Sequence, residues 1–105
     1  MTIYISGPIA GVEDYRFRFA CVERALAQKG WQVISPARLP DGLSRRAYMA
    51  ADLPQLLLCD AVFLMAGWSE RVRCTIEESL ASYAGLRIFY ALSDVPNLTE
   101  REMEV

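Results

Sequence analysis

Glu77 and Asp52 are the residues whose chemistry stands out, because the chain contains no histidine. Proton transfer and nucleophilic attack must then fall to carboxylates, tyrosine or cysteine. A carboxylate pair suits glycosidic chemistry, in which one group attacks or stabilises the anomeric carbon and another protonates the leaving group. The local sequence also allows a simpler interpretation of each: Glu77 as a surface charge, and Asp52 as the cap of a helix that starts over 52–55.

The elements that must position these residues alternate between strand and helix. Short apolar or β-branched segments predict strands over 2–6, 31–35, 60–65 and 87–92. Apolar residues at helical spacing predict a helix up to Gly30 and another over about 44–58, which Pro54 should kink or restart. The helix that contains Glu77 should end at Gly85 and bury an apolar face made of Ile76, Leu80, Tyr83 and Ala84. This order predicts an α/β domain with a parallel sheet and right-handed crossovers.

Three loops should converge at the carboxyl ends of these strands, where parallel sheets open their ligand crevice. They begin at Gly7-Pro8, Pro36-Ala37 and Gly67-Trp68, and the Glu77 helix would project into the same crevice. Asp60 precedes its strand at the opposite edge, so we interpret it as structural. The sequence has neither a P-loop nor a G-x-G-x-x-G dinucleotide motif, and we expect no cofactor.

Length and composition narrow the class of protein. At 105 residues with 53% hydrophobic side chains, the chain should form a single domain over 1–105, with a peripheral tail from about 93. Eleven basic and thirteen acidic side chains give a net charge of −2, which argues against nucleic acid as a partner. No apolar run approaches the roughly 20 residues of a membrane span, so we expect a cytoplasmic protein with a small-molecule ligand and no membrane contact.

The three cysteines form no metal-ligand spacing, so we expect free thiols and no metal. We assign Cys21 and Cys59 to packing. Cys74 lies near a helix start that favours a thiolate, although a buried, inert cysteine is the commoner outcome. The aromatic residues of 15–19 recur at helical spacing and predict core and rim, and segment 99–105 predicts a frayed helix or a partner contact.

An ordered set of motifs resembles the nucleoside 2-deoxyribosyltransferase-like superfamily, and most closely its small branch of bacterial and phage domains. The likeness runs from Ile3 to about Ile88, and the matching pieces are Ile3-Tyr4-Ile5-Ser6-Gly7-Pro8-Ile9, Gly30-x-x-Val33-x-x-Pro36-Ala37, Tyr48-Met49-x-x-Asp52-Leu53, Cys59-Asp60, Gly67-Trp68 and Glu77. The resemblance implies a flavodoxin-like three-layer sandwich with a four- to five-stranded parallel sheet. It also implies N-glycosidic bond chemistry on a deoxynucleoside or its monophosphate, by transfer or hydrolysis.

The resemblance assigns roles to individual residues. Glu77 matches the nucleophile that attacks C1′ of the deoxyribose, and Asp52 matches the residue that holds the sugar and assists proton transfer. The predicted substrate-binding residues are Tyr4, Gly7, Pro8, Gly67, Trp68, Arg71 and Arg73. Because relatives assemble with residues crossing between subunits, we expect at least a homodimer.

Two arginines depart from the family pattern. Arg71 stands where relatives carry Asp or Ser, Arg73 stands where they usually carry Gly, and Ala51 replaces an Arg. The two guanidinium groups could bind a phosphate, could pair with Glu77 and silence it, or could simply be solvated. Arg73 lies four residues before Glu77, a spacing that allows direct contact on a helix. The alternative hypothesis is therefore a catalytically silent nucleotide-binding or regulatory module with a remodelled pocket.

Overall fold

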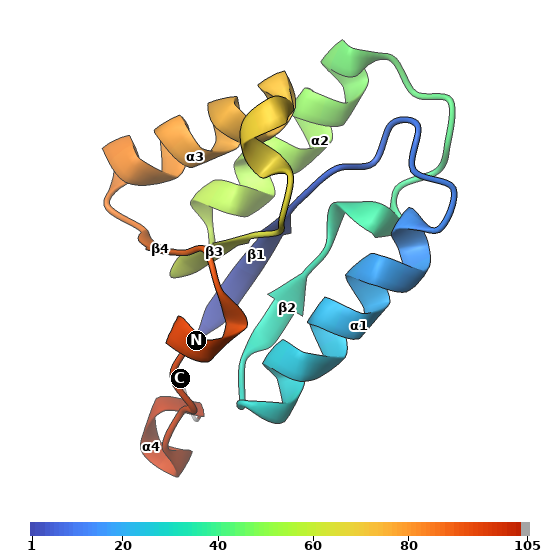
Figure 1. Ribbon diagram of the computed structural model, residues 1–105. Coiled ribbons are helices and arrows are strands. Elements are labelled where there is room, and N and C mark those ends of the chain that lie inside the picture. The colour runs from blue at the N-terminus through green and yellow to red at the C-terminus, as the bar shows by residue number, and fades with distance from the viewer. Residues whose placement is uncertain (104–105) are drawn as a thin grey trace.

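The computed structural model describes residues 1–103 and contains a four-stranded parallel sheet with helices on both faces (Figure 1). The strands are β1 (Thr2–Ser6), β2 (Gln32–Ile34), β3 (Ala61–Leu64) and β4 (Arg87–Phe89), in the spatial order β2-β1-β3-β4. In the register, Ile3 lies opposite Val33 of β2 and Ala61 of β3. The predicted α/β class and flavodoxin-like sandwich are confirmed.

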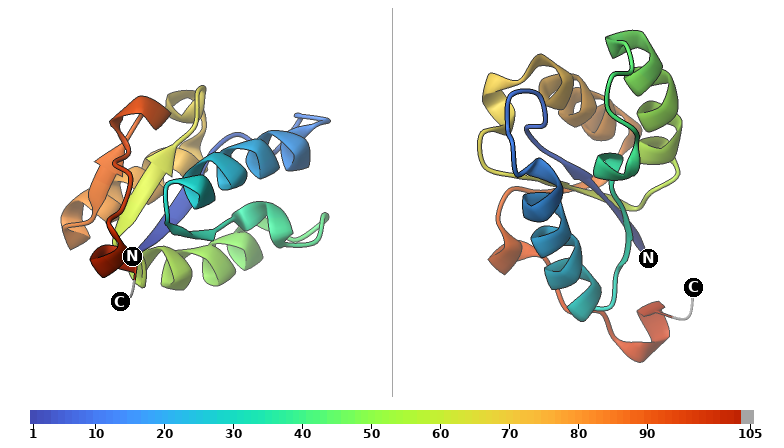
Figure 2. Two further views of the ribbon diagram at one scale, coloured as in Figure 1. Left: turned by 90° about the horizontal axis from the view of Figure 1, so that it is seen from below. Right: turned by 90° about the vertical axis from the view of Figure 1, so that its right-hand side faces the viewer.

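The helices form the two outer layers of the sandwich. They are α1 (Tyr15–Gln28), α2 (Arg45–Leu57), α3 (Val72–Ala84) and the short α4 (Glu100–Met103), with 3-10 turns η1 (Pro36–Arg38), η2 (Trp68–Glu70) and η3 (Leu92–Asp94). Figures 1 and 2 show α1 and the C-terminal segment on one face of the sheet, with α2 and α3 on the other. In the part of the chain that the structure describes, no helix is long and apolar enough to cross a membrane.

The alternation of side chains along β1 divides the core in two. Ile3 and Ile5 belong to the apolar cluster that includes Phe19 and Leu26 of α1. Tyr4 belongs to the second cluster, with residues of α2 and α3. Ser6, two residues after Tyr4, faces the same side and is fully buried. Two hydroxyl groups of the central strand therefore lie beneath α3.

The structure corrects several details of the predicted elements. Three strands are shorter than predicted, because β2, β3 and β4 span only 32–34, 61–64 and 87–89. Helix α2 does not restart at Pro54, which lies inside it on an exposed surface where water can satisfy the freed carbonyl. Asp52 is consequently no helix cap: it lies in the interior of α2 with a buried side chain.

Of the predicted apolar face of α3, only Leu80 packs against the core, and the other three residues are exposed. Ile76 and Tyr83 are exposed, at 44% and 93%, whereas Cys74, Glu77 and Ala81 are buried against the sheet. The helix is turned so that its one acidic buried residue meets the hydroxyl groups of β1, and this satisfies the carboxylate at the expense of apolar area. Periodicity alone cannot anticipate a face that is chosen by a buried polar contact.

Of the other predictions on packing, some are confirmed and one is wrong. The aromatic segment supplies core at Phe19 and an exposed rim at Phe17, as expected. Asp60 is structural, since its carboxylate accepts a hydrogen bond from the Thr2 amide at 2.8 Å. Cys59 is buried, but Cys21 is exposed on α1, so the packing role assigned to it is wrong. Within the predicted tail, a reciprocal hydrogen-bond pair between Thr99 and Glu102 starts α4, and 104–105 lie outside the described residues.

Candidate functional site

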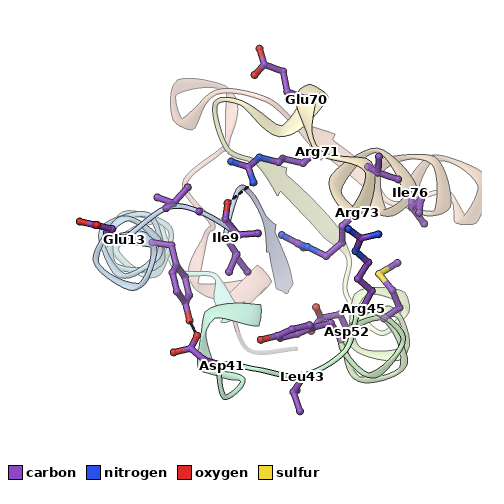
Figure 3. A pocket seen from close by; sticks show the side chains of 17 residues that line it. Ile9, Glu13, Asp41, Leu43, Arg45, Asp52, Glu70, Arg71, Arg73 and Ile76 are labelled. Atoms are coloured by element: carbon purple, nitrogen blue, oxygen red, sulfur yellow. Dashed lines mark hydrogen bonds between the residues drawn. The ribbon is translucent and has the colours of Figure 1, made fainter.

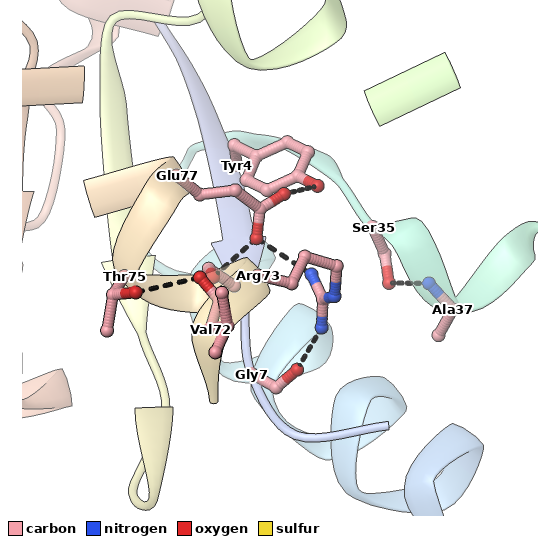
Figure 4. Close-up of polar contacts among 9 residues, drawn as sticks. Tyr4, Gly7, Ser35, Ala37, Val72, Arg73, Thr75 and Glu77 are labelled. Atoms are coloured by element: carbon pink, nitrogen blue, oxygen red, sulfur yellow. Dashed lines mark hydrogen bonds and ion pairs between the residues drawn. The ribbon is translucent and has the colours of Figure 1, made fainter. Parts of the chain in front are cut away.

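The Glu77 carboxylate has no exposed surface and is held by hydroxyl groups of the central strand (Figure 4). The Tyr4 hydroxyl donates to Oε2 at 2.6 Å, and Ser6 Oγ donates to Oε1 at 2.7 Å. Burial, followed by the negative charges of Glu77 and Asp52, raises the pKa of Tyr4, so its hydroxyl keeps the proton that it donates. Glu77 is thus a buried, satisfied group, and the surface-charge interpretation is wrong.

Arg73 supplies the positive charge that this buried carboxylate needs. Its Nη1 donates to Glu77 Oε1 at 2.7 Å, and its Nη2 donates to the carbonyl of Gly7. The Arg73 side chain is 21% exposed, whereas that of Glu77 is 0% exposed. The guanidinium is therefore the side of this ion pair that solvent reaches. Of the three interpretations of the arginines, pairing with Glu77 applies to Arg73.

The local chain path explains why Arg73 and Glu77 share one face. Gly67 turns the chain after β3 with a positive φ of 87°, and the backbone stays extended at Arg71 before α3 begins at Val72. Arg73 therefore stands in the first turn of α3, one helical turn before Glu77. Gly7 is needed opposite this turn, because a Cβ atom there would lie 2.7 Å from Met65 Sδ.

A cleft of about 1010 Å³ opens beside this ion pair (Figure 3). It is lined by the loop between β1 and α1 (9–15), the segment that enters and begins α2 (41–52), and the start of α3 (70–76). Arg73 and Asp52 belong to the lining and Glu77 does not. The two predicted catalytic carboxylates are brought close enough to interact electrostatically, but only one of them faces the cleft.

Asp52 is the acidic group of the cleft whose pKa is raised well above its ordinary value. Its pKa is raised to about 6, first by burial and then by the negative charge of Glu77, while the positive charge of Arg73 acts in the opposite direction. Asp52 also lines a smaller pocket of about 170 Å³ beside η1. A carboxyl group with this pKa exchanges its proton near neutral pH and can act as an acid or a base.

The remaining predicted site residues fall into two groups. Arg71 lines the cleft, and its Nη1 donates to the Ala10 carbonyl at 2.6 Å. Pro8, Gly67 and Trp68 do not line it: Pro8 packs 3.3 Å from where a Gly67 Cβ would lie, and Trp68 stacks on Tyr90 with ring centroids 5.6 Å apart. The two loops therefore meet at Pro8 and Gly67, outside the cleft, and line the cleft with the residues that follow.

Cys74 is a buried cysteine and not a reactive thiolate. It is fully buried, and burial raises the pKa of its thiol despite its place near the start of α3. Within residues 1–103, no three cysteine, aspartate or glutamate side chains gather as a metal site would require.

Two residues of the site were not predicted from the sequence. Ser6 binds the Glu77 carboxylate directly, and the two-residue period of a strand would have placed it on the same face as Tyr4. Arg45, the first residue of α2, lines the cleft opposite α3. Its local signal is the Ser44 cap, which fixes the start of the helix and hence the direction of the next side chain.

The chain belongs to the family described as domain of unknown function DUF4406, whose sequence model matches residues 1–90. The match spans every element from β1 to β4, and thus the Glu77 ion pair and the whole lining of the cleft. No curated protein matches the chain.

Proposed function

We propose that the protein binds a small nucleoside or nucleotide in the cleft as a binding or regulatory module, and that Glu77 does not act as a nucleophile. The state of Glu77 is the observation that carries this proposal. Its carboxylate has no exposed surface, accepts three hydrogen bonds and is absent from the lining of the cleft. A nucleophile must approach the reacting carbon to about 3–3.5 Å, and the side chain beside the cleft is Arg73 instead.

The class of ligand is proposed from the sequence resemblance together with the character of the cleft. Its volume of about 1010 Å³ suits a molecule of nucleotide size. Tyr48 and Met49 supply an aromatic and an apolar surface, and Arg71 and Arg73 supply charge-assisted donors. A flat base would pack against the first pair of residues, and an anionic or hydroxyl-rich group would accept hydrogen bonds from the second pair.

A second candidate is N-glycosidic bond cleavage, and the raised pKa of Asp52 is the observation that favours it. In that reaction a Glu77 oxygen bonds to C1′, the bond from C1′ to the base breaks, and the base takes the electron pair and a proton from Asp52. Water or a second base then attacks C1′, the bond from C1′ to Glu77 breaks, and the attacking group gives its proton to Asp52. The reaction requires Arg73 to leave its ion pair, so that the substrate can reach the carboxylate.

One experiment separates the two candidates. The four common 2′-deoxynucleosides and their 5′-monophosphates are incubated with the wild type, Glu77→Gln and Glu78→Gln; binding is followed by calorimetry and free base by chromatography. Glu78→Gln is the matched control, because it removes the same charge from the adjacent position of α3. In the wild type, Glu78 accepts a hydrogen bond from the surface Tyr90 hydroxyl. We expect binding of at least one compound and no free base.

Free base from the wild type and Glu78→Gln, but not from Glu77→Gln, would contradict the binding module and support the enzyme. Absence of binding by every compound would contradict both candidates.

A further inference from the structure

Three arginines line one part of the cleft. Arg45 comes from the start of α2, Arg71 from the residue before α3, and Arg73 from the first turn of α3. In Figure 3, Arg45 points from α2 toward Arg73, and Arg71 extends over the loop between β1 and α1. Like charges repel, so their convergence calls for a compensating anion.

The charges of two of these arginines are not neutralised by carboxylates. Among residues 1–103, Arg73 is paired with Glu77, whereas neither Arg45 nor Arg71 forms an ion pair. Arg71 donates one hydrogen bond, to the neutral carbonyl of Ala10. A guanidinium carries five N–H donors, so most of the donors of Arg45 and Arg71 are free to bind a ligand.

The acidic residues of the lining do not fully offset this charge. Glu13 and Glu70 point away from the cleft (Figure 3). The Asp41 carboxylate is engaged on the far side, where it accepts hydrogen bonds from Tyr15 and Arg16. Asp52, whose pKa is raised to about 6, is mostly ionised at pH 7, so together with Glu77 it leaves one of the three guanidinium charges uncompensated. The part of the cleft between α2 and α3 is therefore electropositive.

We propose that Arg45, Arg71 and Arg73 form a subsite for a phosphate monoester, so that the ligand of the cleft is a nucleotide in preference to a nucleoside. The planar fork of a guanidinium matches two phosphate oxygens, and guanidinium groups on two helices hold a tetrahedral anion from different directions. The start of α3 adds partial positive charge, since no side chain caps it. This inference rests on the proposed function and names the chemical class of its ligand.

The test compares phosphorylated and unphosphorylated ligands in matched arginine variants. The wild type, Arg45→Gln and Arg46→Gln are titrated by calorimetry, at fixed ionic strength, with the four 2′-deoxynucleosides and their 5′-monophosphates. Inorganic phosphate serves as a competitor. Arg46 is the matched control because it is an exposed arginine of α2, adjacent in sequence, that does not line the cleft.

We expect a monophosphate to bind about 10- to 100-fold more tightly than its nucleoside. Arg45→Gln should weaken the monophosphate by about tenfold and leave the nucleoside unchanged, while Arg46→Gln changes neither. Phosphate should compete with the monophosphate for the wild type.

Two results would overturn the subsite. One is equal affinity for nucleoside and monophosphate with no effect of Arg45→Gln, which leaves the proposed function standing. The other is an equal loss in Arg45→Gln and Arg46→Gln, which indicates attraction by overall charge. Failure of every compound to bind would instead contradict the proposed function itself.

Discussion

Replacement of Asp52 by Asn should stabilise the protein at neutral pH and not in acid. The pKa of Asp52 is raised to about 6 from an ordinary 3.8, chiefly by burial and then by Glu77. Between these two values the folded chain keeps a proton that the unfolded chain has already lost. The folded state therefore binds more protons, and its stability falls as the pH rises through this window.

The size of the effect follows from the two pKa values. One pKa unit corresponds to about 1.4 kcal/mol, so a rise from 3.8 to about 6 costs about 3 kcal/mol of unfolding free energy once Asp52 is ionised in both states. The cost is fully present above about pH 7 and absent below about pH 3. Asparagine has nearly the same shape and carries no charge, so the Asp52→Asn variant should not show it.

Urea unfolding at a series of pH values from 3 to 8 measures the difference between the two proteins. We expect the unfolding free energy of Asp52→Asn, relative to wild type, to rise by about 3 kcal/mol across this range, with most of the rise between about pH 4 and pH 6. Asp94→Asn, which removes an exposed carboxylate far from the cleft, gives the background effect of losing one acidic group. A difference between Asp52→Asn and wild type that is independent of pH would refute the reasoning.

Three further predictions concern the same region and its surroundings. Arg73→Gln should raise the pKa of Asp52 above about 6, because the guanidinium lowers it; a carbon NMR titration of the Asp52 carboxyl measures this, and an unchanged value would contradict it. Gly7→Ala should destabilise the protein by about 1–3 kcal/mol in urea, because its Cβ would lie 2.7 Å from Met65 Sδ; Met65→Ala in the same chain should recover part of the loss, and full wild-type stability of Gly7→Ala would rule out the clash. A thiol reagent should label Cys21 rapidly in the native protein and the two buried cysteines only on unfolding, so rapid labelling of more than one thiol would disagree with the burial.

The order of elements could be predicted because each has its own local signal. The residues of β1 were predicted correctly, since Gly7-Pro8 stops the strand directly after its apolar run. The other three strands were predicted too long, because apolar residues that flank the paired segments, such as Trp31 before β2, are buried in the core without belonging to a strand. The position of Pro54 inside α2 was not predicted either. The free-energy cost of a proline within a helix depends on whether water reaches the freed carbonyl, and a single sequence does not specify this exposure.

The contacts of the site depend on which faces meet, and so only some could be predicted. The spacing of Arg73 and Glu77 by four residues allowed their ion pair, but three interpretations stayed open until burial was known. The hydroxyl groups of Tyr4 and Ser6 decide the matter, because they turn Glu77 toward the sheet. A pairwise contact over more than 70 positions of sequence has no local signal.

Arg73 links the stability of the fold to the occupancy of the cleft. Removing one partner of a buried ion pair costs about 3–5 kcal/mol, so the fold relies on Arg73 to compensate Glu77. An anion bound beside Arg45 and Arg71 would draw on the same guanidinium, whose remaining contact is the Gly7 carbonyl. If the protein is a binding module, the ligand binds Arg73 while the ion pair between Arg73 and Glu77 stays intact. If it is an enzyme, the ligand must loosen this ion pair and expose Glu77. The two candidate functions thus differ in the movement of one side chain, which makes Arg73 the residue at which they are best distinguished.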